Sequence, residues 1–301
     1  MAVSLLELAP ELLFQILSNV PVNSRLRFSQ CCQYAHSLAN ASLQTLKLDF
    51  GGIYEWTEKS TCDSRNKILI QVPDANRYDF TTLLNLHSAL LPSILGRYHL
   101  ALQHLDLKLW TLTVPMAKAI SVLPALQSLS IKLVEDLRIR KLSRKCLNHQ
   151  HDAWQILAQS AVWKNKLRSL SINKADLLMP HLVLLLQGNH SCRELRVKYC
   201  DSLGSELWKF LENDWDGNAL EILELADCGS LVTEEALNSI ATFRKLKHLD
   251  LHGCAVSYIE TVEQWIDRMA HVANVKPPRL HSSSEGNILE VDPAYMTNQY
   301  Y

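Results

Sequence analysis

The sequence has no apolar run of the roughly 18 residues that a membrane-spanning helix needs. Its longest candidate, residues 177–186, contains Pro180 and His181. Glu7 and Glu11 stand where a secretion signal has a basic start and an uncharged core. The formal net charge of -1 at pH 7 gives no strong attraction to nucleic acid or to an anionic membrane. These absences predict a protein of the cytoplasm or the nucleus, with neither nucleic acid nor membrane as a partner.

Signatures of catalysis and of metal binding are also missing. The sequence has no glycine-rich phosphate loop, no nucleophile elbow and no His-Glu-x-x-His helix. Its eight cysteines include no Cys-x-x-Cys pair, which argues against a zinc ribbon or a RING-type site. In a reducing compartment these cysteines are expected to be free thiols. We therefore predict a protein that is not an enzyme, with no catalytic residue, no cofactor and no metal site.

What the sequence does contain is a recurring Leu-x-x-Leu-x-Leu segment. Each copy predicts a short strand whose alternate residues point to one side. One such strand cannot bury its apolar face alone, but stacked copies can, so the repeat predicts a solenoid. Most steps between copies fall in the range of roughly 20 to 29 residues that is typical of leucine-rich repeats. The second leucine of the successive copies is Leu105, Leu129, Leu170, Leu195, Leu223 and Leu249, and a separate early copy has Leu46.

Helical patterns lie between these predicted strands. Apolar residues recur at helical spacing in the segments 115–123, 152–163, 177–187, 204–211 and 233–243. We therefore expect an α/β fold, in which a curved parallel sheet carries helices on its convex side. Cys200, Cys228 and Cys254 each follow the last apolar strand position by three residues. In this register they resemble the cysteine-containing subfamily of leucine-rich repeats, which implies small thiols buried beneath successive turns; a metal or redox cluster is the alternative.

The first fifty residues follow a different pattern. Pro10 suits the start of a helix, and Leu13, Ile16, Leu17 and Val20 form one apolar stripe along it. A second helix and a third short turn are expected after Pro21. The segment from residue 4 to about 46 resembles the F-box motif, with Ala9 at the place of the motif's proline and Pro10 after it. The matching positions are Leu8, Leu12, Leu13, Ile16, Leu17, Val20, Leu26, Phe28 and Cys31.

This resemblance implies a specific role. F-box proteins dock through a small three-helix module onto a Skp-family adaptor and through it onto a cullin, while their repeats hold the protein to be ubiquitylated. The chain would thus be the non-catalytic substrate receptor of a Skp/cullin/F-box ubiquitin ligase. The residues that correspond to the adaptor contact are Leu8, Pro10, Glu11, Leu12 and Ile16. The alternative is that residues 5–40 only cap the solenoid, and that the chain is a leucine-rich-repeat scaffold unconnected to ubiquitin.

The expected organisation has three parts. Residues 1–42 form the F-box-like module, residues 43–275 form the solenoid with insertions near 50–98 and 134–152, and residues 276–301 form a tail. The second insertion is basic and is either a solvated loop or an anion-binding loop; it contains Arg138, Arg140, Lys141, Arg144 and Lys145. For an unidentified protein substrate, we predict contacts on the concave side of the later strands, at Arg196, Lys198, Glu224, Asp250 and His252.

Overall fold

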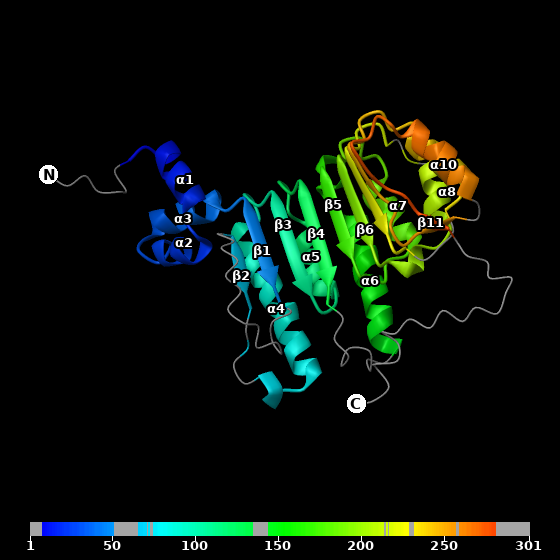
Figure 1. The fold of residues 1–301 in the computed structure, drawn as a ribbon. Coiled ribbons are helices and arrows are strands. Elements are labelled where there is room, and N and C mark those ends of the chain that lie inside the picture. The colour runs from blue at the N-terminus through cyan, green and yellow to red at the C-terminus, as the bar shows by residue number, and fades with distance from the viewer. Residues whose placement is uncertain are drawn as a thin grey trace.

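The computed structural model describes residues 8–50, 66–70, 72, 75–134, 144–213, 215, 217–228, 232–256 and 259–280. Three short helices come first, and strands that alternate with helices follow (Figure 1). The helices are α1 Pro10–Asn19, α2 Val22–Phe28, α3 Gln33–Ser42, α4 Phe80–Tyr98, α5 Val114–Ser121, α6 Arg144–Ser160, α7 Met179–Leu186, α8 Glu206–Asn213, α9 Glu234–Ala241 and α10 Ile259–Arg268. The strands are β1 Thr45–Asp49, β2 Lys67–Leu69, β3 His104–Leu109, β4 Ser128–Leu133, β5 Ser169–Asn173, β6 Glu194–Lys198, β7 Ile222–Ala226, β8 His248–Asp250, β9 Ala255–Val256, β10 Asn274–Lys276 and β11 Arg279–Leu280.

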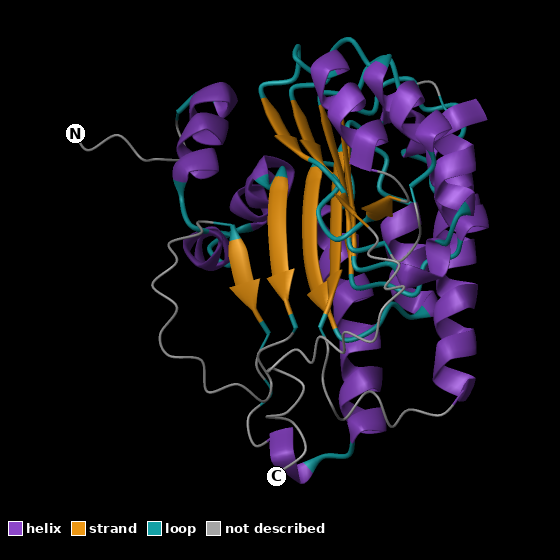
Figure 2. Ribbon diagram, turned by 45° about the vertical axis from the view of Figure 1, so that its right-hand side comes forward, coloured by secondary structure: helices purple, strands orange, loops and turns teal. Residues whose placement is uncertain are grey.

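In the described part of the chain, nine strands form one sheet in the order β10-β8-β7-β6-β5-β4-β3-β1-β2, and every neighbouring pair is parallel. Figure 2 shows the helices that connect the strands gathered on one side of the sheet. The opposite face, which we call the open face, carries the alternate side chains of the strands. The expected α/β architecture with a parallel sheet is confirmed.

The leucine repeat sets the register of this sheet. The second leucines of successive copies are direct partners on neighbouring strands, and the early copy joins the same row because β1 pairs with β3. All of them are buried, and each such leucine stabilises the fold by about 2 kcal/mol. The predicted strand positions are therefore confirmed, and the row is Leu46, Leu105, Leu129, Leu170, Leu195, Leu223 and Leu249.

Successive strands end in the same type of turn. Lys174, Tyr199 and Asp227 have φ values of 57°, 54° and 52°, and Gly253 has 79°. Left-handed backbone is unusual for residues other than glycine, so its recurrence marks a shared turn geometry. Each of the three non-glycine residues donates its backbone N–H to a carbonyl oxygen of the next repeat. The residue that follows the left-handed position is small and buried: Ala175, Cys200, Cys228 and Cys254.

The buried thiols lie beneath these turns, as predicted. Cys228 donates to the carbonyl oxygen of Val197 at 3.3 Å, and Cys254 donates to that of Leu225 at 2.8 Å. Burial raises the pKa of Cys200 and of Cys254 to about 11. These contacts join adjacent repeats with an uncharged donor, and all three cysteines are free thiols.

The three N-terminal helices pack as a small unit beside the sheet (Figure 1). Leu13 and Leu17 of α1 meet Leu38 of α3 in a core of their own. Arg25 of α2, which is only 4% exposed, connects this unit to the sheet. Its guanidinium donates to the carbonyl oxygens of Val20, Ser18 and Ser42 and, at 2.9 Å, to Oδ1 of Asn66 next to β2. This buried cation is thus satisfied by dipoles from several segments.

Several elements differ from the sequence-based expectation. Where a third short turn was expected after Pro21 there is a full helix, α3, so the unit has the three helices that the F-box resemblance implies; Cys32 caps α3 by accepting the N–H of Ala35 at 3.4 Å. Helix α6 begins at Arg144, so part of the basic insertion near 134–152 is helical. The insertion near 50–98 contains strand β2 and helix α4. Strand β10 ends at Lys276, which is the first residue of the expected tail. Arg138, Arg140 and Lys141 lie outside the described residues.

None of the helices in the described part of the chain combines the length and the apolar character needed to cross a membrane.

Candidate functional site

The first candidate surface is the outer face of α1. Leu13 and Leu17 point into the helical unit, whereas Leu12 and Ile16, also four residues apart, are 49% and 40% exposed. Helix α1 is therefore apolar on two sides, and the described residues cover only one of them. An exposed apolar pair on a short helix indicates a protein contact.

The residues predicted for the adaptor contact divide between surface and core. Pro10 and Glu11 are exposed in the first turn of α1, beside Leu12 and Ile16. Leu8 is half-buried and packs against the small core of the unit. The prediction did not include Phe14 and Tyr34, which are exposed aromatic side chains on α1 and α3. The sequence signal that could have pointed to Phe14 is its position outside the apolar stripe predicted for this helix.

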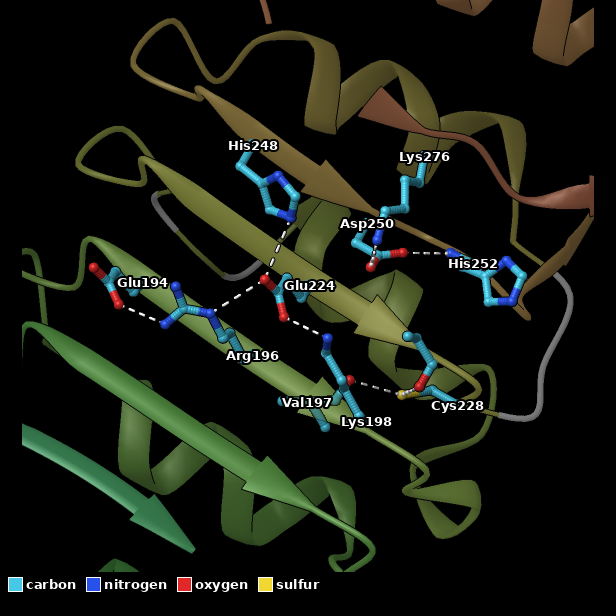
Figure 3. A network of polar contacts seen from close by, with 11 residues as sticks. Glu194, Arg196, Val197, Lys198, Glu224, Cys228, His248, Asp250, His252 and Lys276 are labelled. Carbon is cyan, nitrogen blue, oxygen red and sulfur yellow. Dashed lines mark hydrogen bonds and ion pairs between the residues drawn. The ribbon is translucent and has the colours of Figure 1, made fainter. Parts of the chain in front are cut away.

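The second candidate surface is the open face of strands β6, β7 and β8, where charged side chains form one network (Figure 3). Glu224 lies at its centre. Its Oε2 atom is 2.6 Å from Nζ of Lys198, and its Oε1 atom is 3.2 Å from Nε of Arg196 and 3.3 Å from Nε2 of His248. Arg196 also pairs with Glu194 on its own strand. Register explains this arrangement, because Arg196, Glu224 and Asp250 are successive partners across three strands.

Asp250 differs from the other predicted contact residues because it is only 4% exposed. Nζ of Lys276 in β10 covers it at 3.0 Å, and the backbone N–H of His252 donates to it at 3.0 Å (Figure 3). The His252 side chain itself is exposed. From the sequence, Lys276 was expected at the start of the tail, so its ion pair with Asp250 was missed.

The surrounding contacts keep the carboxylates of Glu224 and Asp250 ionised. Burial raises the pKa of Glu224, but the bonds from Lys198 and Arg196 outweigh this effect and hold its pKa below the ordinary value. The pKa of Asp250 is likewise lowered, because the N–H of His252 and the ammonium of Lys276 outweigh its partial burial. Each charge on these strands thus has a partner within the chain, and the network forms an ordered ionic wall.

A hollow of about 310 Å³ lies on the open face next to this wall. Its floor is formed by short side chains of β4 and β5, and taller side chains of β1, β3 and β6 rise on both sides. We call it the serine hollow. It is lined by Thr45, Lys47, His104, Asp106, Ser128, Ser130, Ser169, Ser171, Glu194 and Arg196, together with Leu46 and Leu105.

Metal-binding side chains do not gather on either surface. Across the described residues, no group of three or more His, Cys, Asp or Glu side chains is placed to hold a metal ion. Both surfaces offer apolar contact, hydrogen bonds and charge. Their chemistry is that of recognition.

Residues 5–43 match the family model of the F-box domain. The match spans α1, α2 and α3 and includes the exposed pair Leu12 and Ile16. F-box domains bind Skp-family adaptors, so this unit implies a role as the adaptor-binding component of a Skp/cullin/F-box ubiquitin ligase. F-box proteins are generally non-catalytic members of such complexes. No curated protein matches the chain.

Proposed function

We propose that the chain is the substrate-recognition subunit of a Skp/cullin/F-box ubiquitin ligase. The observation that carries this proposal is that an F-box unit with an uncovered apolar helix face stands beside a parallel sheet whose open face carries no helix among the described residues. We further propose that this sheet is a leucine-rich-repeat solenoid of the cysteine-containing type over residues 43–275. The F-box unit then occupies residues 1–42, and residues 276–301 form a tail.

The adaptor contact is proposed at Leu8, Pro10, Glu11, Leu12 and Ile16. Covering the two exposed aliphatic side chains removes apolar surface from water, which favours association by about 25 cal/mol per Å². The adaptor then connects the chain to a cullin.

The target contact is proposed on the open face, at the predicted residues Arg196, Lys198, Glu224, Asp250 and His252. Complementary charge in such a row favours a partner of the opposite pattern. The chain makes no covalent bond in this role. It raises the effective concentration of a target lysine near a charged conjugating enzyme.

A comparison of two variants in cells separates this role from that of a scaffold unconnected to ubiquitin. Leu12→Asp removes the adaptor contact but leaves the open face unchanged. Proteins held by the chain should then stay bound to the variant and accumulate, because they are no longer ubiquitylated. Leu100→Asp is the matched control, since Leu100 is 71% exposed and lies outside the F-box match. If the bound proteins keep the same abundance and ubiquitylation with both variants, the scaffold role is correct.

A further inference from the structure

The two halves of the open face differ in how their charges are satisfied. On β6 to β10, the carboxylates of Glu224 and Asp250 are already bound by cations of the chain. Near the serine hollow, three other charges are not satisfied in this way: Lys47 and Asp106 line the hollow, and Lys132 lies just beyond it, two residues after Ser130 on β4. Within the part of the chain that the structure describes, the side chains of Lys47, Asp106 and Lys132 form neither an ion pair nor a hydrogen bond.

This difference determines where on the open face a partner gains the most binding free energy. A partner that contacts Glu224 must compete with Lys198, Arg196 and His248 for the same two oxygens. A partner that contacts Lys132 displaces only water, because this lysine is exposed and forms no ion pair within the described residues. The net gain from a new charged contact is therefore larger at the hollow than on the ionic wall.

The free charges have a spacing that matches an extended chain. Asp106 pairs with Ser130 across β3 and β4, and Lys132 follows Ser130 by two residues on the same face. With strands about 4.8 Å apart and a rise of about 3.3 Å per residue, Asp106 and Lys132 lie roughly 8 Å from each other. Side chains two residues apart on an extended segment are separated by about 6.6 Å. One such segment can therefore reach both charges.

The floor of the hollow, beside these charges, leaves room for a main chain. Ser130 and Ser171 are direct partners on β4 and β5, and neither side chain has a hydrogen-bond partner within the described residues. Their hydroxyl groups can donate to or accept from a peptide group laid over them. The Glu194–Arg196 pair then bounds the segment on the side of β6.

We propose that the target protein presents an extended segment to the serine hollow, with an acidic side chain against Lys132 and a basic side chain two residues away against Asp106. The proposal rests on the proposed receptor function and moves the centre of the target contact from the ionic wall to strands β3 to β6. The acid is a carboxylate of aspartate or glutamate. A phosphate would carry close to two negative charges, whereas Lys132 supplies a single positive charge.

Photo-crosslinking of the full chain in complex with its adaptor tests this placement. p-Benzoylphenylalanine at Ser130 reports on the hollow, and the same group at Ile222 on β7 reports on the wall. The crosslinked target segment is sequenced and made as a synthetic peptide. We expect a segment with an acid and a base two residues apart. The peptide should bind the Lys132→Glu variant about tenfold more weakly than the unchanged chain.

A charge exchange and a matched variant complete the test. Replacing the peptide's acid by lysine should restore its binding to Lys132→Glu. Lys118→Glu makes the same change on exposed residue 118 of helix α5 and should leave peptide binding unchanged. A segment without this charge pair, or unchanged affinity for Lys132→Glu, overturns the proposal. Crosslinks from Ile222 alone would contradict target binding at the serine hollow but would agree with the receptor function. If neither position crosslinks while the adaptor stays bound, both proposals fail.

Discussion

The thiol of Cys228 donates to the carbonyl oxygen of Val197, 3.3 Å away on the preceding strand (Figure 3). Cys254 repeats this relationship with Leu225 one strand later. A buried carbonyl oxygen thus gains a donor that brings little polarity of its own. The turns after successive strands are thereby tied to one another from inside the sheet.

Thiol labelling of the folded chain should separate the cysteines into two classes. Cys31 and Cys32 are exposed and should react readily with a disulfide reagent. Cys200 and Cys254 should react slowly, because burial excludes the reagent and raises the pKa of each thiol to about 11. Mass spectrometry of the labelled peptides distinguishes the positions, and unfolding in urea should make all of them reactive. Fast labelling of Cys254 in the folded chain would contradict its assignment beneath the turn.

Arg25 should be the polar residue on which the junction between the helical unit and the sheet depends most. Arg25→Met leaves the carbonyl oxygens of Val20, Ser18 and Ser42 without this donor. We expect the free energy of unfolding to fall by about 3 kcal/mol, measured by urea denaturation. Arg27→Met, an exposed neighbour on the same helix, should change it by less than about 0.5 kcal/mol. Equal effects of the two changes would show that the junction does not depend on this guanidinium.

His87 should make the fold sensitive to acid. It is 1% exposed, its ring lies 4.5 Å from Trp110 and 4.8 Å from Phe50 between centroids, and burial lowers its pKa to about 4. The unfolded chain binds a proton near pH 6.5, so stability is present above that pH and is lost as the pH falls from 6.5 toward 4. Between pH 7 and pH 5 we expect a loss of about 2 kcal/mol in the free energy of unfolding. The His87→Leu variant should lack this part of the pH dependence; if it retains the full loss, other groups cause it.

The strands could be predicted because their signal is local and periodic. Leu105, Leu129 and Leu170 mark alternate buried positions that any parallel stacking must align, and the register follows them. The early copy at Leu46 joined the same row although helix α4 and strand β2 separate it from β3 in the sequence. Burial of the repeated leucines decides the pairing, whatever the length of the connection.

Other features depend on contacts that no local pattern encodes. Lys174 and Tyr199 have left-handed backbone without being glycine, so the sequence does not predict this conformation. It follows from the stacking of equivalent turns. Asp250 is covered by Lys276, which was expected in the tail. The difference between the ionic wall and the serine hollow arises in the same way. It is the pairing of side chains across strands, rather than the residue types, that leaves Lys132 without an ion-pair partner among the described residues.

The central claim is that the exposed face of α1 binds the adaptor. Isothermal titration of a purified Skp-family adaptor into the full chain tests it most directly. We expect binding by the unchanged chain and by Leu100→Asp, and no measurable heat with Leu12→Asp, because a charge would be buried in an apolar contact at a cost of several kcal/mol. Circular dichroism should show the same fold for all three, since Leu12 is 49% exposed. Unchanged adaptor affinity in a folded Leu12→Asp chain would contradict the account.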